Sequence, residues 1–199
     1  MTSMKPFKKA IIASLFSLGI GFSSASYADH YIIDTEGMHA SIEFKVSHLG
    51  ISFMKGQFRQ FTGDFHYDPA NQAASKVKVK IDATSLDTNH AERNIHLKGA
   101  DFFDVKKHKE AGFVSTGYTV VDAENGVMHG NFTLRGITHP LDIKVTHTGG
   151  GQDPWGGYRQ GFEGHATLSL KDYKMKGAGK LGPASDKVEV TLYIEGIKQ

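Results

Sequence analysis

Residues 188–195 read Val188-Glu189-Val190-Thr191-Leu192-Tyr193-Ile194-Glu195, an uninterrupted alternation of apolar and polar side chains. Successive side chains of a β-strand point to opposite faces of its sheet, so this spacing gathers the apolar residues on one face and the polar residues on the other. The stretch therefore predicts a β-strand with one buried and one solvated face.

Similar stretches recur along the chain and predict eight long strands, preceded by a short strand at Tyr31–Asp34. Six alternate in the same way, and the two near residues 56–67 and 111–121 are rich in aromatic and β-branched residues. The strand expected to be longest is Tyr158–Asp172. Turn signals separate the strands, for example Asp68-Pro69-Ala70-Asn71 and Gly149-Gly150-Gly151. Because parallel pairing needs long crossovers, these short connections favour antiparallel neighbours.

Eight antiparallel strands with one solvated face form either a closed barrel or a two-sheet sandwich. Strands of ten or more residues favour the tilted strands of a barrel, and an eight-stranded barrel is wide enough to hold one small ligand. We therefore expect an all-β protein, an extended eight-stranded antiparallel barrel. One insertion near residues 85–110 lacks alternation, and it has room for a short helix at His90–Leu97.

The first 28 residues have the features of a secretory signal peptide. A basic start with Lys5, Lys8 and Lys9 precedes about 13 apolar residues and a small-residue stretch that ends at Ala28. We expect cleavage there, which leaves residues 29–199 as a single domain in the periplasm. Without the three lysines the chain has 20 Lys and Arg against 21 Asp and Glu. Its overall charge therefore gives no reason to expect nucleic acid or an anionic membrane surface as a partner, although a local basic patch could still exist.

Common catalytic and metal-binding motifs are absent from the sequence. It contains no Gly-x-Ser-x-Gly, no His-Glu-x-x-His, no phosphate-binding loop and no cysteine. The 11 histidines include no pair at a usual ligand spacing, although residues distant in the sequence could still meet on a sheet. We expect no catalytic residue, no metal site and no cofactor.

The insertion carries most of the polar candidates. Arg93 and His96 are three residues apart and would share one helix face. In one interpretation they form a polar collar at a pocket mouth; in the other, the insertion is a well-capped loop in which Arg93 pairs with an acidic residue, Asp87, Asp101 or Asp104. Phe102 and Phe103 would anchor the loop against the barrel. Trp155, in a glycine-rich loop, is either a lid or a loop anchor.

The order of several motifs resembles the YceI-like family over essentially all of residues 29–196. The motifs are Tyr31-x-Ile33-Asp34, His39-Ala40-x-Ile42-x-Phe44-x-Val46-x-His48-Leu49-Gly50, Gly56-x-Phe58-x-x-Phe61-x-Gly63, Ser85-x-Asp87-Thr88, Arg93-x-x-His96-Leu97, Asp101-Phe102-Phe103, Gly130-x-x-Thr133-Leu134-x-Gly136-x-Thr138-x-Pro140 and Val188-x-Val190.

The resemblance implies a lipocalin-like barrel whose interior holds a long apolar chain. The ligand would be a polyisoprenoid, an isoprenoid quinone or a fatty amide, and the family brings no catalytic activity. The residues that would line the pocket are Ile42, Phe44, Phe58, Phe61, Phe113 and Phe132, and those at its polar mouth are Arg93, His96 and Asp101.

Two other functions remain open from the sequence. The barrel could act through a protein partner, or in a stress response, without carrying lipid; an interior filled by side chains would support this. It could also modify a lipid by using His96 and Asp101 as an acid–base pair, because a barrel fold alone does not exclude catalysis.

Overall fold

The computed structural model describes Met1 and residues 28–180 and 182–199. Within it, strand β11 (Lys187–Lys198) pairs with three other strands. It pairs with β10 (Tyr158–Ser169) along its length. On its other side it pairs first with β2 (Ser41–His48) and then, at its end, with β1 (Asp29–Ile33). All three pairings are antiparallel, and the β1–β11 pairing closes the sheet into a barrel.

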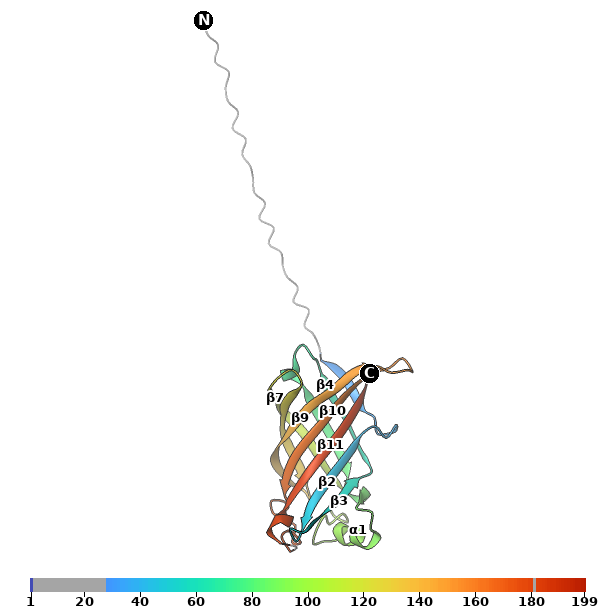
Figure 1. The fold of residues 1–199 in the computed structure, drawn as a ribbon, viewed down its shortest axis with the longest axis vertical. Helices are drawn as coiled ribbons and strands as arrows, with labels where there is room; N and C mark the ends of the chain where they lie inside the picture. The colour runs from blue at the N-terminus through green and yellow to red at the C-terminus, as the bar shows by residue number, and fades with distance from the viewer. Residues whose placement is uncertain (2–27, 181) are drawn as a thin grey trace.

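The closed barrel contains eight antiparallel strands, the number that the sequence predicts, but it includes the short β1 in place of β2. Their order is β1-β4-β5-β7-β8-β9-β10-β11, and β2, β3 and β6 extend the sheet beyond β11 (Figure 1). The remaining strands are β3 (Ser52–Phe58), β4 (Phe61–Tyr67), β5 (Lys76–Asp82), β6 (Leu86–Asp87), β7 (Glu110–Val120), β8 (Asn125–Leu134) and β9 (Ile137–Gln152).

Two strand predictions are wrong in detail. The single strand predicted near residues 56–67 is divided into β3 and β4, because the backbone at Arg59 and Gln60 bonds to the 3₁₀ segment η2 (Ala83–Ser85) and its flank. The Arg59 amide donates to the Ser85 carbonyl, and the Asp82 amide donates to the Gln60 carbonyl. The longest strand is the 16-residue β9, whereas the predicted Tyr158–Asp172 strand ends at Ser169.

The glycine run Gly149–Gly151, predicted as a turn, lies instead at the end of β9 and pairs with β10. The turn follows at Asp153–Gly157, where the Asp153 carboxylate accepts from the amides of Trp155 and Gly157. Gly150 is needed because the Gln160 side chain lies over it: a Cβ there would be 2.3 Å from the Gln160 Oε1. Gly150 therefore permits a close approach of the Gln160 side chain to the sheet.

The predicted helix is confirmed as α1 (Ala91–Lys98), one residue later than expected. His90 caps it, since its Nδ1 accepts from the Arg93 amide at 3.2 Å. Phe103 packs edge-on against Phe58 at 5.7 Å between ring centroids, so it anchors the insertion to the barrel. The other short helices are the 3₁₀ segments η1 (Gln72–Ala74) and η3 (Pro183–Asp186).

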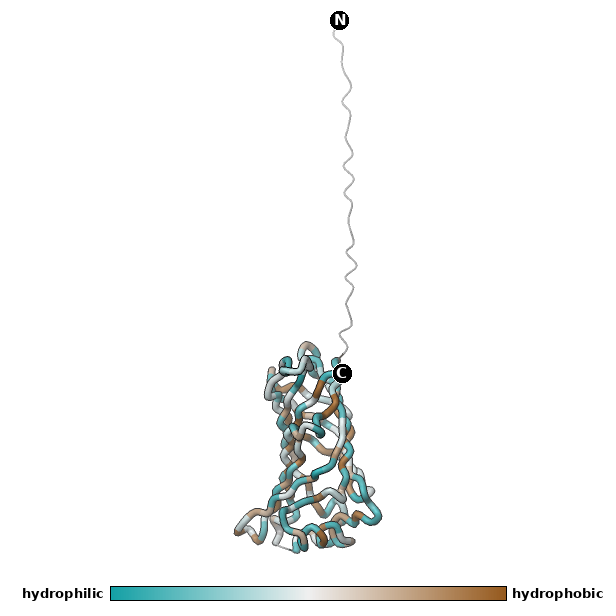
Figure 2. The backbone as a smooth tube through the Cα atoms, turned by 90° about the vertical axis from the view of Figure 1, so that its right-hand side faces the viewer, coloured by the Kyte–Doolittle hydropathy of each residue, from teal (hydrophilic) through white to brown (hydrophobic). Residues whose placement is uncertain are grey.

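The barrel is elongated and widens at the end that carries α1, opposite the C-terminus (Figure 2). The predicted signal peptide lies almost wholly outside the described residues. Among the described residues, no helix combines the length and apolar character needed to cross a membrane.

Candidate ligand-binding cavity

The inward side chains leave a cavity of about 500 Å³ inside the barrel. Alternate residues from Phe162 on β10 to Leu170, just beyond its end, border the cavity. Eight residue steps at about 3.3 Å correspond to about 26 Å along the strand, or about 20 Å along the axis of a barrel with tilted strands. The cavity is therefore a long channel, and its volume is within the range of small-molecule sites.

The structure places five of the six predicted lining residues at this cavity. These are Ile42, Phe44, Phe58, Phe113 and Phe132. Phe61 is not among the bordering residues and is buried in the hydrophobic core. Contact of any of the six with a ligand stays a prediction.

Many other lining residues are aliphatic, and sequence reasoning did not single them out. Val188, Val190, Leu192 and Ile194 on β11 all border the cavity. Their alternation predicts an inward direction, but an inward side chain can either fill a core or border a void. Only the three-dimensional packing separates these two cases.

Two of the three residues predicted at the polar mouth border the cavity, and one does not. Arg93 and His96 border the cavity at the α1 end, whereas Asp101 does not and lies 3.8 Å from Lys180 Nζ. The Arg93 guanidinium donates from Nε to Thr88 Oγ1 at 2.8 Å and from Nη2 to the Thr88 carbonyl at 2.7 Å. Arg93 thus fixes the chain just before α1.

The interpretation in which Arg93 pairs with Asp87, Asp101 or Asp104 is wrong for the described part of the chain. Asp87 accepts instead from Asn94 at 3.0 Å and from Arg59 Nε at 2.6 Å, and Asp104 pairs with Lys107. The hydrogen bonds from Asn94, the Asn89 amide and Arg59 lower the pKa of Asp87 to about 2. Asn94, Arg59 and Lys107 are therefore the partners of these two carboxylates, and the Arg93 guanidinium bonds to Thr88 instead.

Among the described residues, no hydrogen bond joins the side chains of His96 and Asp101. The His96 ring packs edge-on against Phe102 at 5.1 Å, and the Asp101 carboxylate faces Lys180. The acid–base pair that the catalytic alternative needs is therefore not assembled here.

The end of the cavity away from α1 is aromatic. The Phe162 ring lies 5.1 Å from the rings of both Tyr67 and His147. Burial raises the pKa of the Tyr67 hydroxyl. Trp155 does not border the cavity; it is 79% exposed at this end, with the Arg159 guanidinium 5.8 Å from its ring.

Ser75 borders the same end of the cavity, and its Oγ is the buried side-chain polar atom without a hydrogen-bond partner among the described residues. An unsatisfied buried hydroxyl costs about 1–3 kcal/mol. We expect Ser75→Ala to raise the melting temperature of the ligand-free protein by about 2–12 °C, measured by differential scanning calorimetry. A lower melting temperature would mean that Ser75 has a partner in solution.

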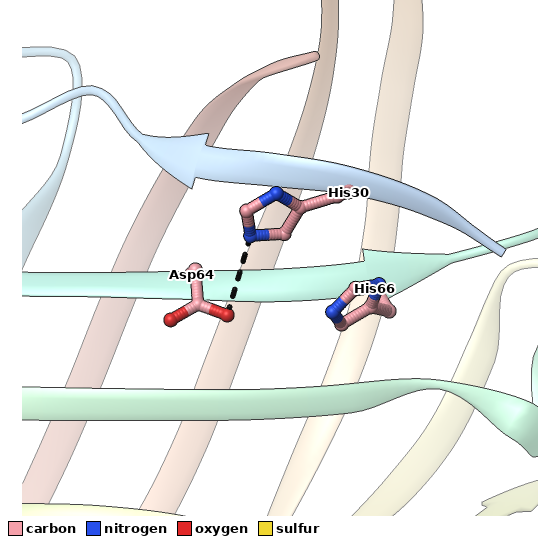
Figure 3. Close-up of side chains that lie close together, drawn as sticks. All are labelled: His30, Asp64 and His66. Carbon is pink, nitrogen blue, oxygen red and sulfur yellow. Dashed lines mark ion pairs between the residues drawn. The ribbon is translucent and has the colours of Figure 1, made fainter. Parts of the chain in front are cut away.

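The sequence predicts no metal site, but the fold brings His30, Asp64 and His66 together on β1 and β4 (Figure 3). One ligand atom from each lies within 4.8 Å of the others. A second cluster joins Asp34, His39 and Glu195. The spacing of the histidines in the sequence reveals neither cluster, because each joins two segments that are distant in the chain.

Comparison with known proteins shows a match to the model of the YceI-like domain over residues 31–196. A UPF0312 protein of Shewanella sp. (strain ANA-3) is 50% identical over 194 residues, which cover 96% of this chain and all of the relative. A UPF0312 protein of Shewanella baltica (strain OS155) is 48% identical over the same lengths.

Solved structures share the barrel fold. The Campylobacter jejuni YCEI protein superposes with a TM-score of 0.69 at 27% identity, covering 77% of this chain and 90% of that one. Burkholderia cenocepacia BcnA has a TM-score of 0.72 at 23% identity and covers 82% and 98%. A polyisoprenoid binding domain from Saccharophagus degradans has a TM-score of 0.63 at 14% identity and covers 85% and 98%.

Proposed function

Because the chain belongs to the YceI-like family, we propose that it binds and carries a long-chain apolar ligand, a polyisoprenoid, an isoprenoid quinone or a fatty amide, inside its barrel. The observation that best supports this proposal is the long apolar cavity, which is bordered by Phe44, Phe113, Phe132 and the aliphatic residues of β11. The proposal also has support from the solved polyisoprenoid binding domain that shares this fold.

Burial of the tail supplies the affinity. Each methylene removed from water contributes about 0.8 kcal/mol, so about 20 methylenes contribute about 16 kcal/mol. Association costs about 4–15 kcal/mol, and a preformed channel keeps the ordering part of that cost low. Micromolar or tighter binding corresponds to about 8 kcal/mol, which a tail of this length can reach. Polar contacts at a head group then add selectivity.

Organic extraction of the purified protein, with mass spectrometry of the extract, tests the proposal. We expect a stoichiometric long-chain lipid that is enriched over its proportion in total cell lipid. Protein that is folded and yields no lipid, and that takes up none from a polyisoprenoid or fatty amide suspension, would contradict it.

We propose the periplasm as the place of action, on the basis of the signal-peptide features of residues 1–28. Cell fractionation with N-terminal sequencing tests this, and the expected first residue is Asp29. An N-terminus at Met1 in the cytoplasmic fraction would contradict it.

We expect Arg93→Ala to change which lipids are retained more than how tightly they are held. The half-buried guanidinium supplies hydrogen-bond donors at the cavity border, whereas the tail contacts lie deeper. The measurement is the lipid profile of the extract from wild type and variant. Because Arg93 also holds Thr88, the control is Thr88→Val, which removes that bond but keeps the guanidinium. An unchanged profile in Arg93→Ala would contradict the prediction.

We propose binding rather than catalysis because His96 packs against Phe102 and Asp101 faces Lys180, so the two side chains do not form an acid–base pair. Turnover of an extracted lipid that is lost in His96→Ala would favour the enzyme. A partner-binding barrel that carries no lipid is less well supported, since the interior is not filled by side chains.

A further inference from the structure

We propose that His30, Asp64 and His66 form a binding site for a divalent transition metal ion, Zn²⁺ or one of similar chemistry, on the outer face of the barrel (Figure 3). His30 Nε2 lies 3.4 Å from Asp64 Oδ2, and the rings of His30 and His66 stack at 4.8 Å between centroids. His66 is also among the residues that border the lipid cavity, but the metal site does not depend on the proposed function.

The register of β1 and β4 creates the cluster. His30 lies directly opposite His66, and Ile32 lies opposite Asp64. Asp64 and His66 are two residues apart on β4, so both point to the same face as His30. The intervening residues Tyr31 and Phe65 point inward and are buried. The outward direction of all three ligands is therefore fixed by the buried alternation of the two strands.

The donor set suits Zn²⁺, which binds imidazole nitrogen at about 2.0–2.1 Å and carboxylate oxygen at about 2.0–2.2 Å. A tetrahedral ion needs donor atoms about 3.3 Å apart at these bond lengths. The His30–Asp64 separation of 3.4 Å already meets this, and a side-chain rotation at His66 can bring in the third donor. All three residues are half-buried, so the ion can enter and keep a water molecule as its fourth ligand.

The other cluster is a poorer cation site. The Arg159 Nη1 donates to both Asp34 and Glu195, so a guanidinium already neutralises those carboxylates and would repel a metal ion. At the proposed site the facing residues on β5 are Lys76 and Lys78, opposite His66 and Asp64. Both lysines are exposed, and their flexible side chains can turn to solvent.

The ion would link β1, the strand that closes the barrel, to its neighbour β4. Strand β1 has only five residues and contacts β4 on one side and the end of β11 on the other. A metal that binds the folded state but not the unfolded state raises stability by mass action. We therefore expect Zn²⁺ to raise the melting temperature of the apo-protein.

The test uses the protein without a histidine tag, freed of metal with EDTA and titrated with Zn²⁺ by calorimetry and with Co²⁺ by visible absorption. We expect one ion per chain, and binding at least about tenfold weaker in His66→Gln and in Asp64→Asn. His165→Gln is the matched control, because His165 is also an outward histidine beside an acidic residue, Glu163. Unchanged binding in His66→Gln, or no binding at micromolar Zn²⁺, would overturn the proposal.

A different observation concerns the α1 end of the barrel, which is both basic and apolar. The connections at this end, residues 88–109, 135–136 and 170–186, carry ten Lys and Arg against five Asp and Glu, a net of +5. Those at the other end, residues 68–75, 121–124 and 153–157, carry four acidic and no basic residues. Positive charge is thus concentrated at the α1 end of the barrel and negative charge at the other end, although the overall charge of residues 29–199 is near zero.

Exposed apolar side chains lie within the basic end. Ile51 and Phe53 on the β2–β3 hairpin are 84% and 62% exposed, and Ile95 on α1 is 73% exposed. Figure 1 shows the hairpin and α1 at the same end of the barrel. We infer that this end docks on an anionic lipid surface, where lysines contact phosphate groups and the apolar side chains enter the interface. The cavity border at Arg93 and His96 would then face the membrane.

Vesicle co-sedimentation tests this without any ligand in the barrel. We expect binding to phosphatidylglycerol vesicles, at least about tenfold weaker binding to phosphatidylcholine vesicles, and loss of binding in Phe53→Ser with Ile51→Ser. Trp155→Ser is the control, because Trp155 is equally exposed at the acidic end. Equal binding to both vesicles, or none at low salt, would overturn the inference and leave a protein as the partner of this surface.

Discussion

Ala166→Trp is expected to abolish lipid retention and to leave the barrel folded. Ala166 lies on β10 near the middle of the row of residues that borders the cavity. An indole there projects into the void rather than into packed atoms, so it blocks the channel without overpacking the core. A tail that loses only four methylene contacts loses about 3 kcal/mol, or roughly a hundredfold in affinity.

The measurement is the amount of lipid extracted per mole of protein, together with the melting temperature. Thr167→Trp is the matched control, because the next residue on β10 is exposed on the outer face. We expect the control to retain lipid at the wild-type level. If Ala166→Trp also retains full-length lipid, the ligand does not occupy the channel, and the carrier proposal is wrong.

The fold could be predicted from the sequence because alternation determines which face of each strand is buried. A strand such as Val188–Ile194 has one energetically acceptable orientation, since a slip of one residue would expose its whole apolar face. The division between β3 and β4 could not be predicted in this way. It depends on hydrogen bonds from Arg59 and Gln60 to a segment about 25 residues away.

The candidate site was less predictable. Phe61 and Phe58 both look like inward aromatics in the sequence, yet Phe58 borders the cavity and Phe61 is covered by the core. The histidine cluster shows the same limit more clearly. His30 and His66 are 36 residues apart in the chain, and only the register of β1 on β4 makes them neighbours.

Arg159 joins three carboxylates near the end of the barrel away from α1. Its Nη1 donates to Asp34 at 2.6 Å and to Glu195, and its Nε donates to Asp153 at 2.8 Å. The side chains of Asp34 and Asp153 are only 6% and 7% exposed. The arginine thus links β10, β11, the end of β1 and the Asp153 turn, where the sheet closes.

Arg159→Met is expected to lower the melting temperature by about 6–12 °C. Removing one partner from a buried ion pair costs about 3 kcal/mol or more, because the remaining charge stays buried, and each kcal/mol corresponds to about 2–4 °C at this chain length. Arg59→Met is the control, since Arg59 is 58% exposed and an exposed pair contributes at most about 1 kcal/mol. Equal shifts in the two variants would show that the Arg159 network is not the stabilising element.

The same network predicts how stability changes in acid. The hydrogen bond from Arg159 is the main cause that lowers the pKa of Asp34 to about 2, below its value of about 3.9 in an unfolded chain. A lowered native pKa adds stability that is present above about pH 4 and is lost as the pH falls from about 4 to about 2. In Arg159→Met the pKa of Asp34 rises, so this part of the acid dependence disappears, while the part from Asp87 remains. Melting temperatures of both proteins between pH 7 and pH 2.5 measure the difference, and parallel curves would show that Arg159 does not control the ionisation of Asp34.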